Sequence, residues 1–222
     1  MLKLITSVVT LLICSNAFSA TNQNSEHAQK TLEIYRKVIS IPTAAGKGNV
    51  PEMANYLASE FYAAGFDKQD VTVIPSGETA ALVVRYRGSE SAKKPILLLG
   101  HMDVVEALPE DWQRHPFTLT QDDKYFYGRG TVDNKLGVTM LSSTFIRLKK
   151  EGFVPNRDLI LAFSGDEETG MKTTIMLAKM PALLEAEYAL NSDAGGGDLD
   201  KQGKAIAYLV QAAEKTYVSF EL

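Results

Sequence analysis

Short apolar runs alternate with amphipathic stretches through the middle of the chain. The runs cover residues 96–99, 159–163 and 188–190, and wholly apolar runs of this length are typical of strands that helices cover on both faces. Apolar residues recur at helical spacing over 134–150 and again over 171–180, between successive runs. In the first of these helices, the residues expected to face the core are Leu136, Met140, Leu141, Phe145 and Leu148. Strands that alternate with helices predict an α/β fold, with a three-layer, mostly parallel sheet and helices on both faces.

The segment before this region predicts two further helices and two strands. Ser25 can cap a helix that Pro42 ends, and Pro51 stands in the first turn of a second helix that ends before Gly65. The two strands are expected over 71–74 and 81–86. No internal repeat or low-complexity tract interrupts the pattern.

The first twenty residues have the pattern of a secretory signal. A basic start precedes an apolar run over 4–14, and small residues follow, so we expect cleavage after Ser19 or Ala20 and export to the periplasm or the exterior. The alternative is a retained anchor, but the run is shorter than the ~20 residues that a membrane span needs. Cleavage also removes Cys14, the only cysteine. The mature chain would then have no disulfide and no thiolate, and any metal ligands would be His, Asp or Glu.

Composition and charge exclude some classes of protein. The chain is 45% hydrophobic and 23% charged, which is typical of a soluble globular protein rather than a disordered one. Its net charge of -4 offers no basic surface to neutralise phosphates, so nucleic acid is not an expected partner.

Metal-binding residue types follow each of the three apolar runs. His101 and Asp103 follow the first run, Glu167 and Glu168 the second, and Asp193 the third. Open α/β sheets bind ligands at the carboxyl ends of their strands, so these side chains are expected at one edge of the sheet. If the chain stays extended, His101 and Asp103 point to the same side, and Asp103 can accept a hydrogen bond from the imidazole.

Each motif alone also has an ordinary structural interpretation. His101 could be a hydrogen-bonded loop histidine, and Glu167 and Glu168 could form a solvated acidic turn at the start of a helix. Asp133, just before the helix over 134–150, could be an N-cap, and Asp193 could serve a glycine-rich turn. The combination is more specific than any one motif.

In combination, the motifs resemble those of the M20 metallopeptidase family, which includes aminoacylases, carboxypeptidases and dipeptidases. The similarity extends over about 25–222 in matching order and spacing. The stretches that carry it are Gly100-His101-Met102-Asp103-Val104-Val105, Gly128-Arg129-Gly130-Thr131-Val132-Asp133-Asn134-Lys135, Gly165-Asp166-Glu167-Glu168-Thr169-Gly170 and Ser192-Asp193-Ala194-Gly195.

The resemblance implies a role for each matching residue. Asp133 would bridge two metal ions, one also bound by His101 and Asp193 and the other by Glu168. Glu167 would be the general base, and Asp103 the partner of His101. The bond from Asp133 to the next residue would be cis. The metal would be zinc, with cobalt or manganese as alternatives.

These residue types suit hydrolysis by activated water. Two cations lower the pKa of a shared water and polarise the scissile carbonyl, and Glu167 can take the proton and pass it to the leaving amine. This route needs no covalent intermediate, which agrees with a mature chain that lacks cysteine and has no Gly-x-Ser-x-Gly nucleophile motif. The expected activity is hydrolysis of peptide or N-acyl amino acid bonds, and the expected partner is a small peptide or acyl amino acid.

The chain departs from the family pattern toward its end. The family places a final histidine ligand late in the chain, but the histidines here are His27, His101 and His115. We therefore expect an amino-terminal part of the enzyme: a signal over 1–20, a catalytic-domain part over 21–212, and the first strand of a lid or dimerisation domain over 213–222. A homodimer is expected only for the full-length form.

Two alternatives remain from the sequence. A non-catalytic remnant would keep the fold and bind metal without turnover, but it would be expected to lose ligands or Glu167, and every ligand expected within this part of the family pattern is present. An acidic calcium-binding module fits less well, because calcium sites seldom use histidine. The exact substrate is not encoded in these motifs.

Overall fold

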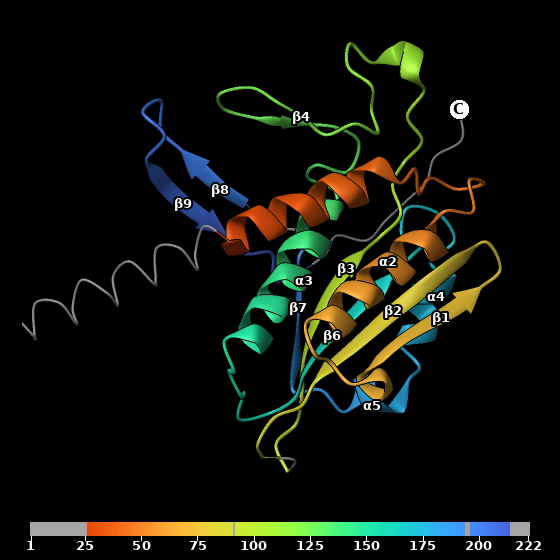
Figure 1. Ribbon diagram of the computed structural model, residues 1–222, viewed down its shortest axis with the longest axis vertical. Coiled ribbons are helices and arrows are strands. Elements are labelled where there is room, and N and C mark those ends of the chain that lie inside the picture. Colours follow the sequence, from red (N-terminus) through yellow and green to blue (C-terminus); the bar gives the residue numbers. More distant parts are fainter. Residues whose placement is uncertain (1–25, 91, 194–195, 214–222) are drawn as a thin grey trace, which may run out of the picture.

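The computed structural model describes residues 26–90, 92–193 and 196–213 (Figure 1). The expected signal over 1–20, and all but the first residue of the expected lid strand, lie outside these ranges. Within them, no helix is both long and apolar enough to cross a membrane.

A five-stranded sheet forms the centre of the fold. The strand order is β1-β2-β6-β3-β7, and the bounds are β1 Val71–Ser76, β2 Thr79–Tyr86, β3 Ile96–His101, β6 Leu159–Ser164 and β7 Tyr188–Asn191. β3 pairs in parallel with both β6 and β7, whereas β2 is antiparallel to both β1 and β6. Four strands therefore share one direction and β2 opposes them, so the expected α/β fold with a mostly parallel sheet is confirmed.

Helices cover both faces of this sheet (Figure 1). On one face lie the helix over 26–40, α2 (Val50–Ala63) and α3 (Lys135–Lys150), and on the other lie α4 (Lys172–Leu177) and α5 (Pro181–Leu184). Successive side chains of a strand point to opposite faces of the sheet, so a strand that lies between the two layers contributes residues to both. On β6, Leu161 and Phe163 belong to the first core, and Ile160 and Ala162 to the second.

The buried face of α3 differs from the sequence prediction. Phe145 is buried as expected, and Leu141 and Leu148 pack partly against the core, but Leu136 and Met140 are 38% and 50% exposed. The buried residues of this helix are Lys135, Val138, Thr139, Ser142, Ser143, Phe145 and Ile146. Hydrophobicity predicts this face only in part, because some of the buried residues are polar and have internal partners. For example, the Thr139 hydroxyl donates to the Lys135 carbonyl at 2.7 Å.

The helix predicted over 171–180 is shorter, and two hairpins were not predicted. α4 ends at Leu177, and Pro181 begins the separate helix α5. One hairpin joins β4 (Thr120–Gln121) to β5 (Phe126–Tyr127), and another joins β8 (Gly196–Leu199) to β9 (Ala205–Leu209). Short 3-10 turns cover Lys68–Asp70 and Pro109–Asp111. β4, β5 and β8 lack the apolar runs of four or more residues that identify buried strands, whereas β9 is an apolar run that the sequence analysis did not use.

Candidate metal centre and active site

The carboxyl ends of β3, β6 and β7 meet at one edge of the sheet. His101, the last residue of β3, pairs with Ser164, the last residue of β6, and Leu99 pairs with Asn191, the last residue of β7. The strand ends therefore place the segments that follow them side by side, as the sequence predicted.

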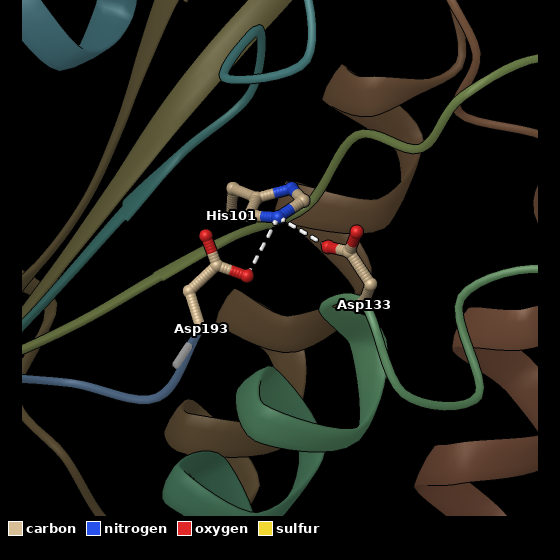
Figure 2. Close-up of side chains that lie close together, drawn as sticks. All are labelled: His101, Asp133 and Asp193. Carbon is tan, nitrogen blue, oxygen red and sulfur yellow. Dashed lines mark hydrogen bonds and ion pairs between the residues drawn. The ribbon is translucent and has the colours of Figure 1, made fainter. Parts of the chain in front are cut away.

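His101, Asp133 and Asp193 form a compact group at this edge. Figure 2 shows the imidazole between the two carboxylates, and Nε2 of His101 lies 2.8 Å from Oδ1 of Asp133 and 3.3 Å from Oδ1 of Asp193. The three candidate ligand atoms lie within 4.8 Å of one another. An imidazole nitrogen and two carboxylate oxygens suit zinc and similar divalent cations, so these residues fit a metal site.

The group is buried at His101 and open to solvent at Asp133. The His101 side chain is 2% exposed and that of Asp133 is 61% exposed, so the site opens toward solvent beside Asp133. Burial alone would lower the pKa of His101, but hydrogen bonds to Asp103 and Asp193 outweigh it and raise that pKa to about 11. The hydrogen bond to His101 lowers the pKa of Asp193. The carboxylates therefore favour a positive charge at Nε2, which a proton or a metal ion can supply.

Asp103 contacts both His101 and the loop after β6. Its carbonyl oxygen lies 3.1 Å from Nδ1 of His101, and its carboxylate Oδ1 lies 3.4 Å from the same nitrogen. A carbonyl oxygen only accepts, so Nδ1 carries the hydrogen in this bond and Nε2 faces the carboxylates. The carboxylate also accepts the backbone N–H groups of Glu167 and Glu168, at 3.1 and 3.0 Å.

Glu167 and Glu168 are half-buried beside this group. Burial raises the pKa of both carboxyls, and the nearby charge of Asp133 raises that of Glu168 further. Together with His101 and Asp193, Glu167 lines a cavity of about 340 Å³, whose other lining residues are mostly apolar. Glu168 is not part of the group that His101, Asp133 and Asp193 form, so its expected role as a ligand of a second ion stays a prediction.

Asn134 and Ser192 support the site, and sequence reasoning gave them no hydrogen-bonding role. Asn134 is buried, and its Oδ1 accepts from the His101 N–H at 3.3 Å and from the Ser192 hydroxyl at 3.1 Å. Its Nδ2 donates to the Ser192 carbonyl at 3.0 Å. The Asp133–Asn134 peptide bond is cis, as the resemblance implied. Asn134 thus links the end of β3 to the segment that carries Asp193.

Lys135 is a second residue whose role the sequence did not reveal. It is fully buried, and its ammonium donates to the carbonyls of Val38 at 2.8 Å and Ile41 at 2.6 Å. Burial lowers its pKa to about 7. The only signal in the sequence was its place at the end of a matching motif. Its contacts connect the start of α3, next to Asp133, to the end of the first helix.

Comparisons with known proteins point to one family. Residues 97–213 match peptidase family M20/M25/M40. A Cys-Gly metallodipeptidase of Candida albicans is 34% identical over 157 residues, which cover 64% of this chain and 32% of that protein. An N-fatty-acyl-amino acid synthase/hydrolase of Xenopus tropicalis is 33% identical over 142 residues, which cover 62% of this chain and 28% of that protein. The chain therefore spans about a third of the length of these curated relatives.

A solved structure shares the fold. The dipeptidase Dug1p of Saccharomyces cerevisiae superposes with a TM-score of 0.68 and 22% identity, over 81% of this chain and 41% of that chain. The family match covers more than half of the 222 residues and includes the segments that carry His101, Asp133, Glu167 and Asp193. From the motifs, the fold and this match, we conclude that the chain belongs to peptidase family M20/M25/M40.

Proposed function

We propose that the full-length protein is a metal-dependent hydrolase of peptide or N-acyl amino acid bonds. The observation that carries this proposal is the group of His101, Asp133 and Asp193 with Glu167 beside it. Enzymes of this family depend on metal, and the relatives above are named as a dipeptidase and an acyl amino acid hydrolase. The substrate is therefore a small molecule with an amide bond.

The residues divide the work of hydrolysis between binding and proton transfer. His101, Asp133 and Asp193 would hold a divalent cation, which when bound lowers the pKa of water and polarises a carbonyl. Glu167 would take the proton of the attacking water and pass it to the departing amine. Burial raises the pKa of Glu167, which moves it toward the range in which a carboxylate exchanges protons efficiently near neutral pH.

The finer assignments rest on the resemblance. We propose that Asp133 and Glu168 hold a second ion and that both ions are zinc, with cobalt or manganese as alternatives. We also propose that the protein is exported and that its partner is a small peptide or acyl amino acid, without nucleic acid or a membrane anchor. The homodimer expected for the full-length form is a proposal as well.

The test separates binding of metal from catalysis. Glu167→Ala in the full-length protein should retain its zinc but lose turnover of dipeptides and acyl amino acids by about 100-fold or more. Asp133→Ala should lose both zinc and turnover. Metal content is measured by mass spectrometry after dialysis, and the exposed Glu110→Ala serves as the matched control.

Two results would contradict the assignment. Equal loss of zinc from the Glu167→Ala and Asp133→Ala proteins would remove the distinction between base and ligand. A wild-type protein that binds zinc tightly but hydrolyses no amide in the panel would favour the non-catalytic metal-binding domain instead.

A further inference from the structure

The loop after β6 carries Glu167 and Glu168 and is anchored at two points. At its far end, the carboxylate of Asp166 accepts the N–H groups of Lys172 and Thr173, at 2.8 and 2.9 Å. At its near end, the N–H groups of Glu167 and Glu168 point to the carboxylate of Asp103, one to each oxygen. Asp103 belongs to another segment, directly after β3, so this anchor joins two strands of the sheet.

The carboxylate of Asp103 is well placed for this role. Its side chain is 4% exposed, and its two oxygens accept two consecutive N–H groups at 3.1 and 3.0 Å. Consecutive N–H groups that converge in this way form a binding site for an anionic group. Charge-assisted hydrogen bonds of this kind are roughly twice as strong as neutral ones.

The imidazole of His101 does not depend on the same carboxylate alone. Its Nδ1 lies closer to the backbone carbonyl of Asp103, at 3.1 Å, than to the carboxylate Oδ1, at 3.4 Å. Nδ1 has one hydrogen to donate. The carbonyl belongs to the main chain, so substitution of the Asp103 side chain leaves this acceptor in place.

We propose that Asp103 is a positioning residue whose carboxylate fixes the backbone of Glu167 and Glu168 relative to His101. This inference rests on the proposed function, because it assigns the loop the task of presenting the general base. The carboxylate contacts neither water nor substrate in this role, and it acts through the placement of Glu167. A displacement of about 1 Å in a reacting group can reduce turnover by about 100-fold.

Two substitutions at Asp103 test the anchor directly. Asp103→Asn keeps the shape of the side chain but leaves one acceptor oxygen, so one of the two amides should lose its partner. Asp103→Ala leaves neither. We therefore expect hydrogen exchange about 10-fold faster or more at one of the Glu167 and Glu168 amides in the Asn variant and at both in the Ala variant.

The matched control is Asp158→Asn, remote from the site. Asp158 also accepts a backbone N–H, that of Gly88 at 2.7 Å, and it pairs with Arg85. Because one acceptor oxygen remains, this variant should lose either the Gly88 hydrogen bond or the Arg85 ion pair, and it should leave exchange at the Glu167 and Glu168 amides unchanged. Exchange is read residue by residue by NMR or by mass spectrometry with fragmentation.

Metal content and kinetics complete the test in the full-length protein. If Asp103 positions the loop, Asp103→Asn should keep its zinc within about twofold, lower kcat about 100-fold and change KM little. If Asp103 acts only through the imidazole, zinc affinity should fall by about 10- to 100-fold, with unchanged exchange at both amides. Unchanged exchange, or zinc loss equal to that of His101→Ala, would overturn the proposal.

The amide measurement also separates this inference from the proposed function. It needs no turnover and can be made on the protein without metal. Suppose that the Asp103 variants show faster exchange at the Glu167 and Glu168 N–H groups, but the wild type hydrolyses no peptide or acyl amino acid. The hydrolase proposal would then be refuted, and the anchor would still stand. Unchanged exchange in an active enzyme would refute the anchor alone.

Discussion

Tyr35 links the first helix to the loop that leads to Asp133. Its ring is buried, and its hydroxyl donates to the Thr131 carbonyl at 2.8 Å. Thr131 in turn donates to the Gly128 carbonyl through its own hydroxyl. One phenol thus fixes a loop two residues before a candidate metal ligand, and its effect can be measured through its own titration.

The pKa of Tyr35 predicts a loss of stability at high pH. Burial raises this pKa from 10.0 to about 12, so the folded protein favours the neutral phenol. The resulting contribution of Tyr35 to the free energy of unfolding is complete below pH ~10 and is lost as the pH rises from ~10 to ~12. Between about pH 9 and about pH 11.5, the wild type should lose about 2 kcal/mol more free energy of unfolding than Tyr35→Phe does.

Urea denaturation at the two pH values measures this difference. The comparison with Tyr35→Phe cancels the titration of the other tyrosines and lysines. At neutral pH, the variant should be less stable by about 1 kcal/mol, because the Thr131 carbonyl loses its donor. An equal loss of unfolding free energy in the two proteins at high pH would show that the phenol has the same pKa in the folded state as in the unfolded chain.

The sequence identified the chemistry-bearing residues but not those that hold them in place. His101, Glu167 and Asp193 follow apolar runs, so their meeting at one edge follows from the general behaviour of parallel strands. Asn134 and Ser192 stand in the matching motifs, but their supporting role was not predicted, because it consists of hydrogen bonds to segments 30 or more positions away. Such bonds have no local signature in the sequence.

At the scale of elements, the start of α3 packs tightly against the segment after β7. Gly137 in the first turn of α3 leaves no room for a side chain, since an added Cβ would lie 2.7 Å from Cβ of Ser192 and 3.0 Å from Nδ2 of Asn134. Asp133 lies just before this helix and Asp193 just after Ser192. The close approach therefore fixes the distance between two candidate ligands.

Gly137→Ala should weaken metal binding although alanine favours helices. Alanine is better than glycine inside a helix by about 1 kcal/mol, but its methyl group would displace Ser192 and with it Asp193. We expect zinc affinity to fall by about 10-fold, or about 1.4 kcal/mol, as measured by calorimetric titration. The control is Thr144→Ala, an exposed position in the same helix.

The sign of the result is informative. Unchanged affinity with a raised melting temperature would mean that Ser192 moves aside without disturbing Asp193. The packing between α3 and the segment after β7 would then play no part in forming the metal site.

The strands of the central sheet could be predicted, whereas the orientation of α3 could not. β3 and β6 are apolar runs that lie between the two layers, and length and composition are enough to recognise them. β7 is also a largely apolar run, although its residues are exposed. α3 buries Lys135 and Ser142 and exposes Leu136 and Met140, so a hydrophobic stripe gives only part of the buried face. The internal partners of Lys135, near the end of the first helix and just after it, are a tertiary feature that periodicity does not report.

At the scale of the whole molecule, the site depends on the complete sheet. Its side chains come from four separate segments of the chain, around His101, Asp133, Glu167 and Asp193. The pairing of β3 with β6 and β7 brings three of these segments together, and the start of α3 places Asp133 beside them. An unfolded chain therefore has no preformed site, and binding of a cation must favour the folded state.

Zinc should raise the melting temperature, and a chelator should reverse the effect. A ligand at about 100 times its Kd stabilises the folded state by about 2.7 kcal/mol, and in a protein of this size that corresponds to about 5–10 °C. The Asp133→Ala variant should show little of this shift, and calcium should not reproduce it at equal concentration, because the group contains a buried imidazole. The shift should also shrink as the pH falls, since zinc must displace the proton that the carboxylates hold on His101. An equal shift with calcium, or an equal shift in Asp133→Ala, would place the bound ion elsewhere on the molecule.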